Sequence, residues 1–397
     1  MLDSKFSPWP SFTDEEIDSV KEVLATNKVN YWTGDECRNF EKEFAAWSDS
    51  KYAVSLANGT LALDIAFKAL EIGDGDEVIV TSRSYIASVT SIINSNAIPI
   101  FVDVDSESQN ITPENISSAI TSKTKAIVCV HLAGWPCEMD EIMSIANDHN
   151  LFIIEDCAQA HGAKYKGVSV GSIGHIGCWS FCQDKIMSTG GEGGMVTTND
   201  KSLWLKMWEY KDHGKSYNAV YEQKHPEGFR WIHESFGTNW RMTEIQGAIG
   251  RIQLNRMAQW TSVRNRNANI LIKCFKDFTD EESLIRIPML KNQKGSVHAY
   301  YKFYVFVRQD FLRDDWDRDR IVSEITSMGI PCMHGSCSEI YLEKAFDNTN
   351  FRPKERLPIA KELGESSIVF LVHPTLSEKE MHVIAESATS VFDRAKK

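Results

Sequence analysis

Short apolar runs and longer amphipathic segments alternate along the first half of the chain. The apolar runs predict buried strands, at residues 52–56, 76–80, 98–104, 126–131 and 151–154. The segments between them repeat apolar residues at helical spacing, as in residues 61–72 and 139–149. Strands that alternate with helices in this way predict an α/β fold with a doubly wound, mostly parallel sheet.

Two capping boxes predict where helices begin at either end of this region. Thr13 with Glu16 precedes apolar residues at helical spacing. Thr243 with Gln246 has the same pattern and begins a long amphipathic helix, which we expect at about residues 244–257.

The pattern changes near residue 260 and indicates a second, smaller unit. A helix is followed there by an alternating strand at residues 300–307 and by a charged segment before further helices. The expected division of the chain is a lead-in segment at residues 1–33, a large domain at 34–258 and a small C-terminal α+β domain at 259–397.

Three residues come within five positions after a predicted strand, namely Gly59, Tyr85 and Asp156. Because the carboxyl ends of parallel strands meet at one edge of a sheet, where ligand sites lie, we expect these residues to be near one another. Gly59 and Thr60 also open a helix, whose free N–H groups and positive dipole end suit a phosphate. The alternative is an ordinary strand–helix turn in which Thr60 caps the helix.

A single lysine followed by a glycine-rich run is a further candidate for the site at this edge. Ser180 is followed five residues later by Lys185 and then by the flexible run at residues 190–194. Pyridoxal 5′-phosphate (PLP) needs a lysine for an imine, a carboxylate for its ring nitrogen and donors for its phosphate. Lys185, Asp156 and the turn at Gly59 fit that set.

Composition excludes several other classes of protein. The formal net charge of -12 over 397 residues disfavours nucleic acid as a partner. No apolar run is long enough to cross a bilayer and no signal peptide is visible at the start, so we expect no membrane partner. Nine cysteines, spread through strand-like and helix-like segments, indicate reduced thiols and a cytoplasmic protein. No cysteine pair has the spacing and histidine partners of a zinc site, so no metal is expected.

Several motifs, in a fixed order, resemble one enzyme family. They are EDCAQAHGAKYKG at residues 155–167, SFCQDK at 180–185, TGGEGG at 189–194 and the G-x-N-x-R-M pattern at 237–242. From about Gly34 to Gln253 the chain is similar to the DegT/DnrJ/StrS group of PLP-dependent nucleotide-sugar aminotransferases. The resemblance implies the aspartate aminotransferase type I fold, with a mixed, mostly parallel seven-stranded sheet flanked by helices and a smaller C-terminal α+β domain.

The resemblance also implies roles for individual residues. Lys185 would hold PLP and move a proton during catalysis, while Asp156 would pair with the ring nitrogen. The remaining cofactor contacts would be made by Gly59, Thr60, Tyr85, Gln159, Ser180 and Asn239. Tyr85 would stack on the ring, Gln159 would sit near its phenolic oxygen, and the others would hold the phosphate.

Asn239 would reach the phosphate of a partner chain, which implies a homodimer with shared sites. The alternative for Asn239 is a loop side chain that caps its own backbone. His161 is a candidate acid–base group, with a positioned or solvated histidine as the alternative. The loop that begins at His334 occupies the position of a substrate-side loop in the family. Arg241 is also consistent with a plain surface charge.

The resemblance implies a reaction as well. Some relatives carry histidine in place of Lys185 and perform a dehydration, so the lysine favours amino transfer from L-glutamate to a nucleotide-linked keto-sugar, with the cofactor alternating between PLP and its amine form, PMP. The favoured acceptor is UDP-4-keto-6-deoxy-N-acetylhexosamine, aminated at C4 for surface-polysaccharide or O-antigen synthesis. A dTDP- or GDP-linked 4-keto-6-deoxyhexose and a 3-keto-sugar are the alternatives.

Two other classes of function are weighed against this one. A nicotinamide-dependent sugar oxidoreductase needs G-x-G-x-x-G after the first strand, and residues 57–60 lack that pattern. A non-catalytic sensor with this fold is disfavoured because Lys185, Asp156, Gln159 and Ser180 are all present.

Overall fold

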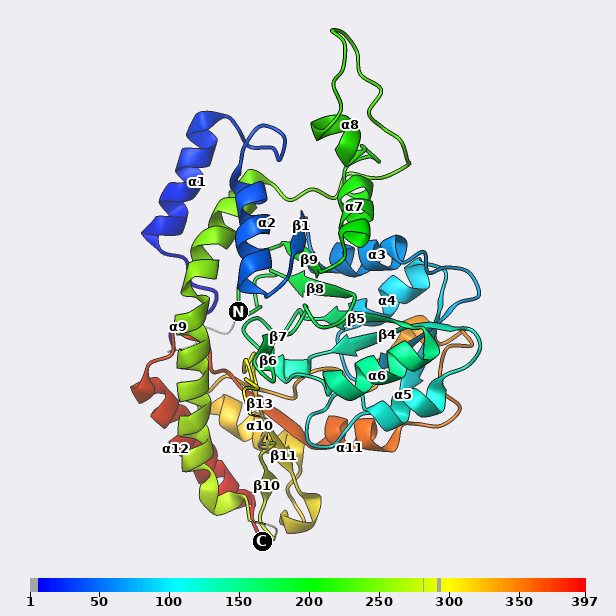
Figure 1. Cartoon of the computed structure of the whole chain (residues 1–397). Coiled ribbons are helices and arrows are strands. Elements are labelled where there is room, and N and C mark those ends of the chain that lie inside the picture. Colours follow the sequence, from blue (N-terminus) through cyan, green and yellow to red (C-terminus); the bar gives the residue numbers. More distant parts are fainter. Residues whose placement is uncertain (1–5, 281, 291–293) are drawn as a thin grey trace.

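A seven-stranded sheet lies at the centre of the larger part of the molecule (Figure 1). The computed structural model describes residues 6–280, 282–290 and 294–397. In this sheet the strand order is β1-β9-β8-β5-β4-β2-β3. The strands are β1 (Tyr52–Leu56), β2 (Glu77–Thr81), β3 (Ile98–Val102), β4 (Thr124–Val130), β5 (Phe152–Asp156), β8 (Ile176–Ser180) and β9 (Gly194–Thr198). Only the pairs β8–β9 and β9–β1 are antiparallel, so the mostly parallel sheet is confirmed.

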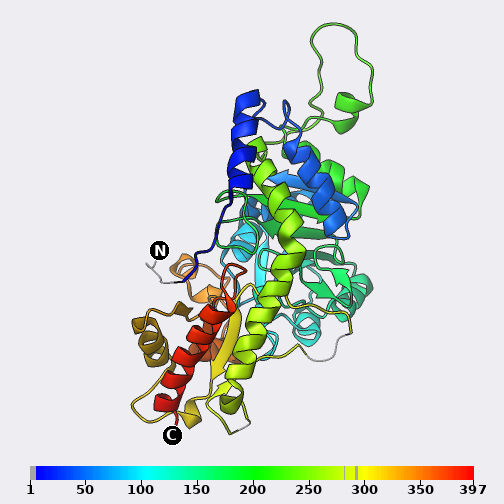
Figure 2. The same ribbon diagram turned by 90° about the vertical axis from the view of Figure 1, so that its left-hand side faces the viewer.

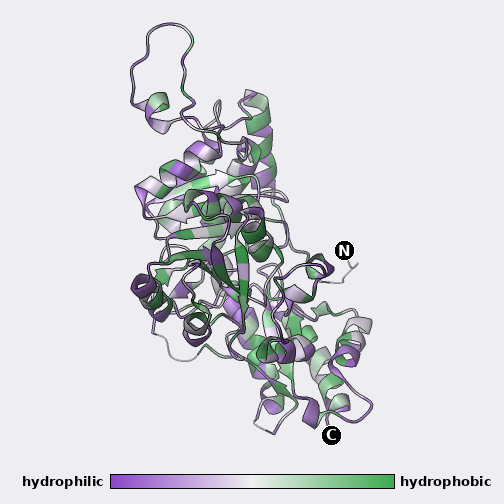
Figure 3. Ribbon diagram, turned by 90° about the vertical axis from the view of Figure 1, so that its right-hand side faces the viewer, coloured by the Kyte–Doolittle hydropathy of each residue, from purple (hydrophilic) through white to green (hydrophobic). Residues whose placement is uncertain are grey.

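Helices cover both faces of this sheet because alternate strand residues point to opposite faces. On β2, Val78 and Val80 join one apolar core, whereas Ile79 joins another. The first core is shared with α3 (Gly59–Ala69), α4 (Ala87–Asn94) and α7 (Lys201–Tyr210), and the second with α5 (Pro113–Ala119) and α6 (Met139–His149). Figure 3 shows the central strands in the green of apolar residues, as expected of strands buried on both faces.

A single helix, α9 (Glu244–Cys274), runs from the larger part of the molecule into the smaller part. Its predicted capping box is present, since the side chain of Thr243 accepts from the amide of Gln246. The predicted end near residue 257 is wrong. No glycine or proline interrupts the helix after Gly250, and apolar residues such as Leu254 and Leu271 keep one side of it buried to its end.

The expected boundary at residues 258–259 therefore lies within a continuous helix. Whether the two parts of the chain are independent folding units stays a prediction.

The predicted capping box at the start of α1 (Asp14–Thr26) is also present.

The smaller part holds a four-stranded antiparallel sheet in the order β10-β11-β13-β12. Its strands are β10 (Ile285–Arg286), β11 (Phe303–Val307), β12 (Cys332–Met333) and β13 (Ser367–Phe370). We predicted an alternating strand from residue 300, but β11 begins at Phe303 and all five of its residues are buried. The alternation is absent because both faces of β11 are covered: Val305 packs in one core and Tyr304 in another.

The remaining described elements are further helices and one hairpin. They are the helices α2 (Glu36–Trp47), α8 (Tyr217–Tyr221), α10 (Arg318–Ser327), α11 (Pro358–Ser366) and α12 (Glu378–Ala395), and the hairpin β6 (Lys164–Tyr165)–β7 (Val168–Ser169). Short 3-10 helices occur at Leu132–Gly134, Lys276–Phe278, Gln309–Phe311, Ile340–Leu342 and Lys344–Phe346. Figure 2 shows α12, in red, packed along α9. None of the helices within the described ranges has the length and apolar character needed to span a membrane.

A long loop after α8 projects away from the body of the molecule at the top of Figures 1 and 2. It covers residues 222–237 and is called the arm below. Three aromatic side chains on the arm are exposed, namely Phe229 at 78%, Trp231 at 83% and Phe236 at 99%.

Candidate active site

A cavity of about 740 Å³ lies at the carboxyl edge of the central sheet. It is lined by the residues that follow β1, β2, β5 and β8, and on its other side by residues of the smaller part, including Tyr301, Lys302 and residues 335–337. Every predicted site residue except Asn239 lines it: Gly59, Thr60, Tyr85, Asp156, Gln159, Ser180 and Lys185. The structure therefore brings these side chains together, while their roles toward a cofactor stay predictions.

The N-terminus of α3 opens into this cavity. Asn58 caps the helix, because its side-chain oxygen accepts from the amide of Leu61 at 3.0 Å, so the cap is not Thr60. The other amides of the first turn have no acceptor within the helix and are available to an anion. A Cβ on Gly59 would lie 2.5 Å from the Cβ of Ser180. Only glycine lets this helix end approach the Ser180 hydroxyl so closely, and the result is a cradle of donors.

Asp156, the last residue of β5, supplies a fixed carboxylate to the cavity. The hydroxyl of Ser88 donates to its Oδ2 at 2.7 Å, and the amide of Ala158 donates to its Oδ1 at 3.1 Å. Ser88 in turn lies 2.9 Å from the hydroxyl of Ser84. The sequence reasoning missed Ser88; its position three residues after Tyr85, on the same strand-following segment, was the available signal.

The neighbouring acid, Glu155, points away from the cavity and has a structural role. Its carboxylate accepts from three backbone amides, those of Gly171, Ile173 and Gly174. Nε2 of His131 lies 2.9 Å from Glu155, and Nδ1 of His131 accepts from the amide of Cys137, so Nε2 carries the proton and donates. Cys157 lies close enough to complete a metal-ligand set with these two residues. However, the ring nitrogens of His131 and the carboxylate oxygens of Glu155 are already engaged in hydrogen bonds. The cluster is therefore a hydrogen-bonded part of the core and does not offer a metal site.

Gln159 is oriented by the turn at residues 132–134. Its Oε1 accepts from the amide of Ala133 at 2.8 Å. That bond leaves the NH2 group of the side chain as the donor that Gln159 can offer to an oxygen in the cavity.

The amine of Lys185 lies among polar and aromatic groups. Its Nζ is 3.6 Å from Oδ1 of Asp184 and 5.3 Å from the ring centroid of Tyr301. The hydroxyl of Tyr301 donates to the other oxygen of Asp184. Burial acts to raise the pKa of Asp184, but the Lys185 ammonium and the Tyr301 hydroxyl outweigh it and hold that pKa below its usual value. The indole N–H of Trp9 donates to the backbone oxygen of Lys185 at 2.8 Å and fixes the loop.

Asp184, Tyr301 and Lys302 are cavity residues that the sequence reasoning did not single out. Asp184 stood inside the SFCQDK motif, next to the lysine. Tyr301 and Lys302 carried no local signal, because only the folded chain brings the smaller part to this edge.

His161 is fully buried and does not line the cavity. Its ring lies 5.2 Å from that of Trp179 and 5.6 Å from that of Phe181, and neither ring nitrogen has a hydrogen-bond partner among the described residues. Burial, with the charges of Lys185 and Arg264, lowers the pKa of His161 to about 3. The ring is therefore neutral near pH 7.

The remaining candidates lie outside the cavity lining. Asn239 is exposed and sits on the segment that leads from the arm to α9. Arg241 is not a plain surface charge, because its guanidinium lies 2.7 Å from the buried carboxylate of Asp212. His334 is half exposed, 3.3 Å from Asp319, although the three residues after it line the cavity.

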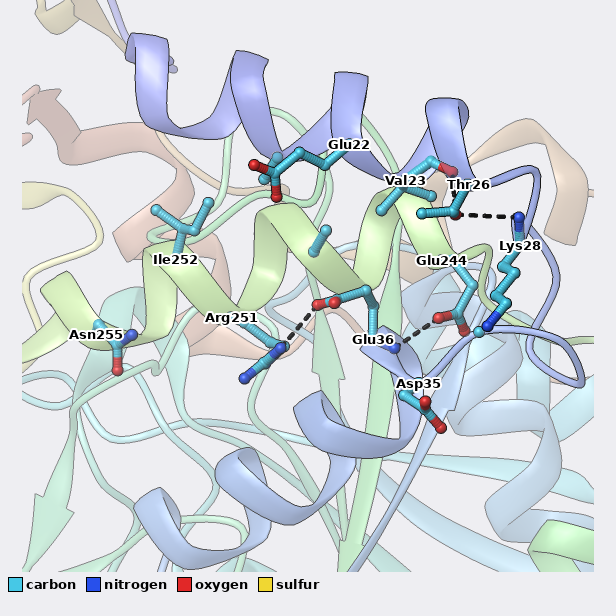
Figure 4. A pocket seen from close by; sticks show the side chains of 13 residues that line it. Glu22, Val23, Thr26, Lys28, Asp35, Glu36, Glu244, Arg251, Ile252 and Asn255 are labelled. Carbon is cyan, nitrogen blue, oxygen red and sulfur yellow. Dashed lines mark hydrogen bonds and ion pairs between the residues drawn. The ribbon is translucent and has the colours of Figure 1, made fainter.

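A second cleft, of about 460 Å³, lies between α1, α2 and α9 (Figure 4). The carboxylate of Glu244 accepts from the amide of Glu36 at 2.6 Å and so caps α2. Arg251 pairs with Glu36 at 2.9 Å and with Glu43 at 2.7 Å. These charged groups hold α2 against α9, and Arg256 of α9 pairs with Glu16 of α1 at 2.7 Å, which accounts for the arrangement of the three helices without a ligand.

The cavity at the sheet edge fits PLP by the chemistry of its donors. A helix N-terminus and a hydroxyl form a phosphate cradle that a Cβ on Gly59 would fill. A carboxylate at a strand end and a lysine amine line the same space. In the second cleft, the first amides of α2, those of Glu36 and Cys37, already donate to the Glu244 carboxylate.

Comparison with known proteins agrees with this chemistry. The model of the DegT/DnrJ/EryC1/StrS aminotransferase family matches residues 10–389. An aminotransferase from Psychrobacter cryohalolentis, solved by X-ray crystallography, is 61% identical with a TM-score of 0.97, over 98% of this chain and 99% of that one. A GDP-perosamine synthase of Escherichia coli O157:H7 is 36% identical over 96% of this chain and 97% of its own length. A UDP-N-acetyl-3-dehydro-alpha-D-glucosamine 3-aminotransferase of Acidithiobacillus ferrooxidans is 32% identical over 97% and 95%.

Proposed function

This chain belongs to the DegT/DnrJ/EryC1/StrS aminotransferase family, and we propose that the cavity at the sheet edge is its active site, with Lys185 as the cofactor-bearing residue. Family membership makes the protein a PLP-dependent sugar aminotransferase. The observation that carries the assignment of the site is the meeting of Lys185, Asp156 and the N-terminus of α3 in one cavity.

Each of these cavity residues has its own proposed contact with the cofactor. When bound, PLP supplies an aldehyde that exchanges amines and a ring that draws off electrons. Asp156 keeps the ring nitrogen protonated, and the Ser88 hydroxyl and Ala158 amide hold its carboxylate in place for that contact. The first-turn amides of α3 and the Ser180 hydroxyl bind the phosphate. Tyr85, which is 67% exposed and lines the cavity, offers a flat face to the ring.

Lys185 has two tasks in succession. Its amine would hold the cofactor covalently until a substrate amine binds. The free amine would carry a proton to and from the substrate carbon that bears the nitrogen, which is the acid–base role that amino transfer needs. Asp184, at 3.6 Å, steadies the released amine when it carries the proton.

The proposed substrates are L-glutamate as donor and a nucleotide-linked 4-keto-6-deoxy sugar as acceptor, aminated at C4. UDP-4-keto-6-deoxy-N-acetylhexosamine remains the first acceptor to test. The relative named as a GDP-perosamine synthase supports the GDP-linked alternative, and the relative named as a UDP-linked 3-aminotransferase supports the 3-keto alternative.

A half-reaction experiment decides between these acceptors. The enzyme is first loaded with L-glutamate, and nucleotide keto-sugars are then offered one at a time while the absorbance of the aldehyde form of the cofactor is followed. The acceptor restores that absorbance rapidly. Failure of every keto-sugar, with a wild-type enzyme that binds PLP, would contradict the proposed function.

We further propose a homodimer in which each chain completes the other's site. Asn239 is exposed and lies outside the cavity of its own chain. The arm beside it exposes Phe229, Trp231 and Phe236, and a cluster of large apolar side chains on a projecting loop is typical of a surface that a partner covers. A second copy of this chain, with Asn239 reaching its phosphate cradle, accounts for both features.

A further inference from the structure

Lys302 is a second lysine of the cavity and immediately precedes β11. Its Nζ lies 5.2 Å from the ring centroid of Tyr301, the same ring that Lys185 faces. Over the described parts of the chain, its ammonium takes part in no hydrogen bond or ion pair. A partly buried cation that lines the cavity is thus left without an ion-pair partner among the described residues.

The environment of Lys302 is unfavourable for an unpaired charge. Burial lowers the pKa of this amine; the Asp184 carboxylate opposes that effect, and the Lys185 ammonium adds to it. The desolvation of a cation is normally offset by a paired anion or hydrogen bonds. The pairing group is therefore expected to come from outside the chain.

Asp184 is not the counter-ion that Lys302 lacks. One of its oxygens accepts from the Tyr301 hydroxyl, and the other faces the amine of Lys185 at 3.6 Å. When Lys185 is joined to the cofactor, Lys302 is the one cation left among the described residues that line the cavity, which also include Asp156 and Glu192.

The backbone before Lys302 is held firmly in place. The amide of Ala299 donates to Gly134 at 2.9 Å, and that of Tyr301 donates to Ala133 at 2.8 Å. Arg264 donates to the backbone oxygen of Tyr300 at 3.2 Å. Tyr300 has a φ of 47°, a left-handed conformation that is strained for a bulky side chain. A strained backbone conformation persists only where the surrounding contacts hold it, and such residues cluster at functional sites. This one lies two residues before Lys302.

We propose that Lys302 binds an oxyanion of a substrate, either a carboxylate of the amine donor or a phosphate of the nucleotide sugar. This inference rests on the proposed function, which brings both anions to this cavity. An ammonium that is already partly desolvated and held in position forms a strong charge-assisted hydrogen bond with either group. Lys302 is thereby a substrate-binding residue distinct from the groups that hold the cofactor.

The test measures equilibrium binding to the PLP-loaded enzyme by calorimetry. Glutarate, a dicarboxylate without an amine, probes the donor's carboxylates, and UDP and GDP probe the phosphates. Lys302→Met is compared with Lys302→Arg, which keeps the charge, and with Lys201→Met, which removes an exposed lysine at the start of α7. We expect Lys302→Met to weaken at least one probe by about tenfold or more. Lys302→Arg should stay within about threefold of wild type, and Lys201→Met should bind as wild type does.

Each outcome has a definite meaning. Loss of glutarate binding alone identifies the donor carboxylate, loss of nucleotide binding alone identifies the phosphate, and loss of both means that the two anions use Lys302 in turn. Unchanged affinity for all probes overturns the inference. Lys302→Gln is measured in parallel, so that unchanged affinity in whichever variant folds is decisive. Inactivity of the wild-type enzyme toward keto-sugars would instead contradict the proposed function.

Discussion

The hydroxyl of Ser88 donates to Oδ2 of Asp156 at 2.7 Å, which joins the first turn of α4 to the end of β5. The contact spans 68 residues of sequence and is buried. It turns a strand-end acid into an oriented carboxylate, since the second oxygen is fixed by the amide of Ala158. The orientation matters for the proposed hydrogen bond between this carboxylate and the protonated ring nitrogen of the cofactor, because such a bond depends on direction as well as on charge.

Asp156→Asn is expected to fold and to bind cofactor but to slow turnover by about a hundredfold or more, because the ring nitrogen loses the charge that keeps it protonated. Ser88→Ala keeps the charge and loses one hydrogen bond, so its turnover should fall by only about tenfold. Steady-state rates with the accepted keto-sugar measure both variants. An Asp156→Asn enzyme with near-normal turnover would remove the role we give this carboxylate.

Gly59→Ala should weaken PLP binding by about tenfold or more, because the new Cβ would meet Ser180 at 2.5 Å and push the end of α3 out of the cradle. The matched control is Gly73→Ala, where the nearest atom outside its chain neighbours would be 3.6 Å away. Cofactor titration followed by absorbance gives both affinities. Equal affinities in the two variants would show that the close approach at Gly59 does not shape the phosphate site.

Burial of neutral His161 predicts a loss of stability in acid. The pKa of His161 is about 3 in the folded protein against 6.5 for an exposed histidine, so protonation favours the unfolded chain as pH falls below 6.5. Between pH 7 and pH 5 this residue alone should cost about 2 kcal/mol of unfolding free energy. His161→Phe removes the titration and keeps a ring beside Trp179 and Phe181. Urea unfolding at both pH values should show a smaller pH effect in the variant; an equal effect would contradict the assignment.

Shared sites predict that two inactive variants rescue each other. In a mixed dimer of Lys185→Ala and Asn239→Ala chains, one site lacks both groups and the other has neither substitution. If the Asn239 contact is needed, mixing equal amounts and allowing exchange should restore up to about a quarter of wild-type activity. Sedimentation of each variant checks whether the chains form a dimer. No recovery, in chains that do exchange, would count against a contribution of Asn239 to the partner's site.

The edge at which the site lies was predictable from the sequence. Gly59, Tyr85 and Asp156 each follow an apolar run, and parallel strands end on one side, so their meeting follows from the pattern alone. The resemblance to the aminotransferase family is confirmed by the family match. The strand positions were predictable because apolar runs mark them. The end of α9 was not predictable, because no residue after 257 marks the point at which the helix leaves the core of the larger part and enters that of the smaller part.

The residues of the smaller part that line the cavity could not be predicted from the sequence. Tyr301 lies 117 residues from Asp184, and their hydrogen bond depends on how α9 carries the smaller part back to the sheet edge. No local pattern encodes that return. Lys302 was missed for the same reason, because the sequence before β11 resembles any other strand entry.

We predict that Lys185, and no other lysine of the cavity, carries the cofactor. Borohydride reduction of the PLP-loaded enzyme followed by peptide mapping tests it most directly, since reduction fixes the cofactor on the amine that holds it. We predict that the label appears on Lys185 in the wild type and in Lys302→Met, and that Lys185→Ala is not labelled. Label on Lys302, or an enzyme that shows no absorbance band for bound cofactor after PLP is supplied, would contradict the account.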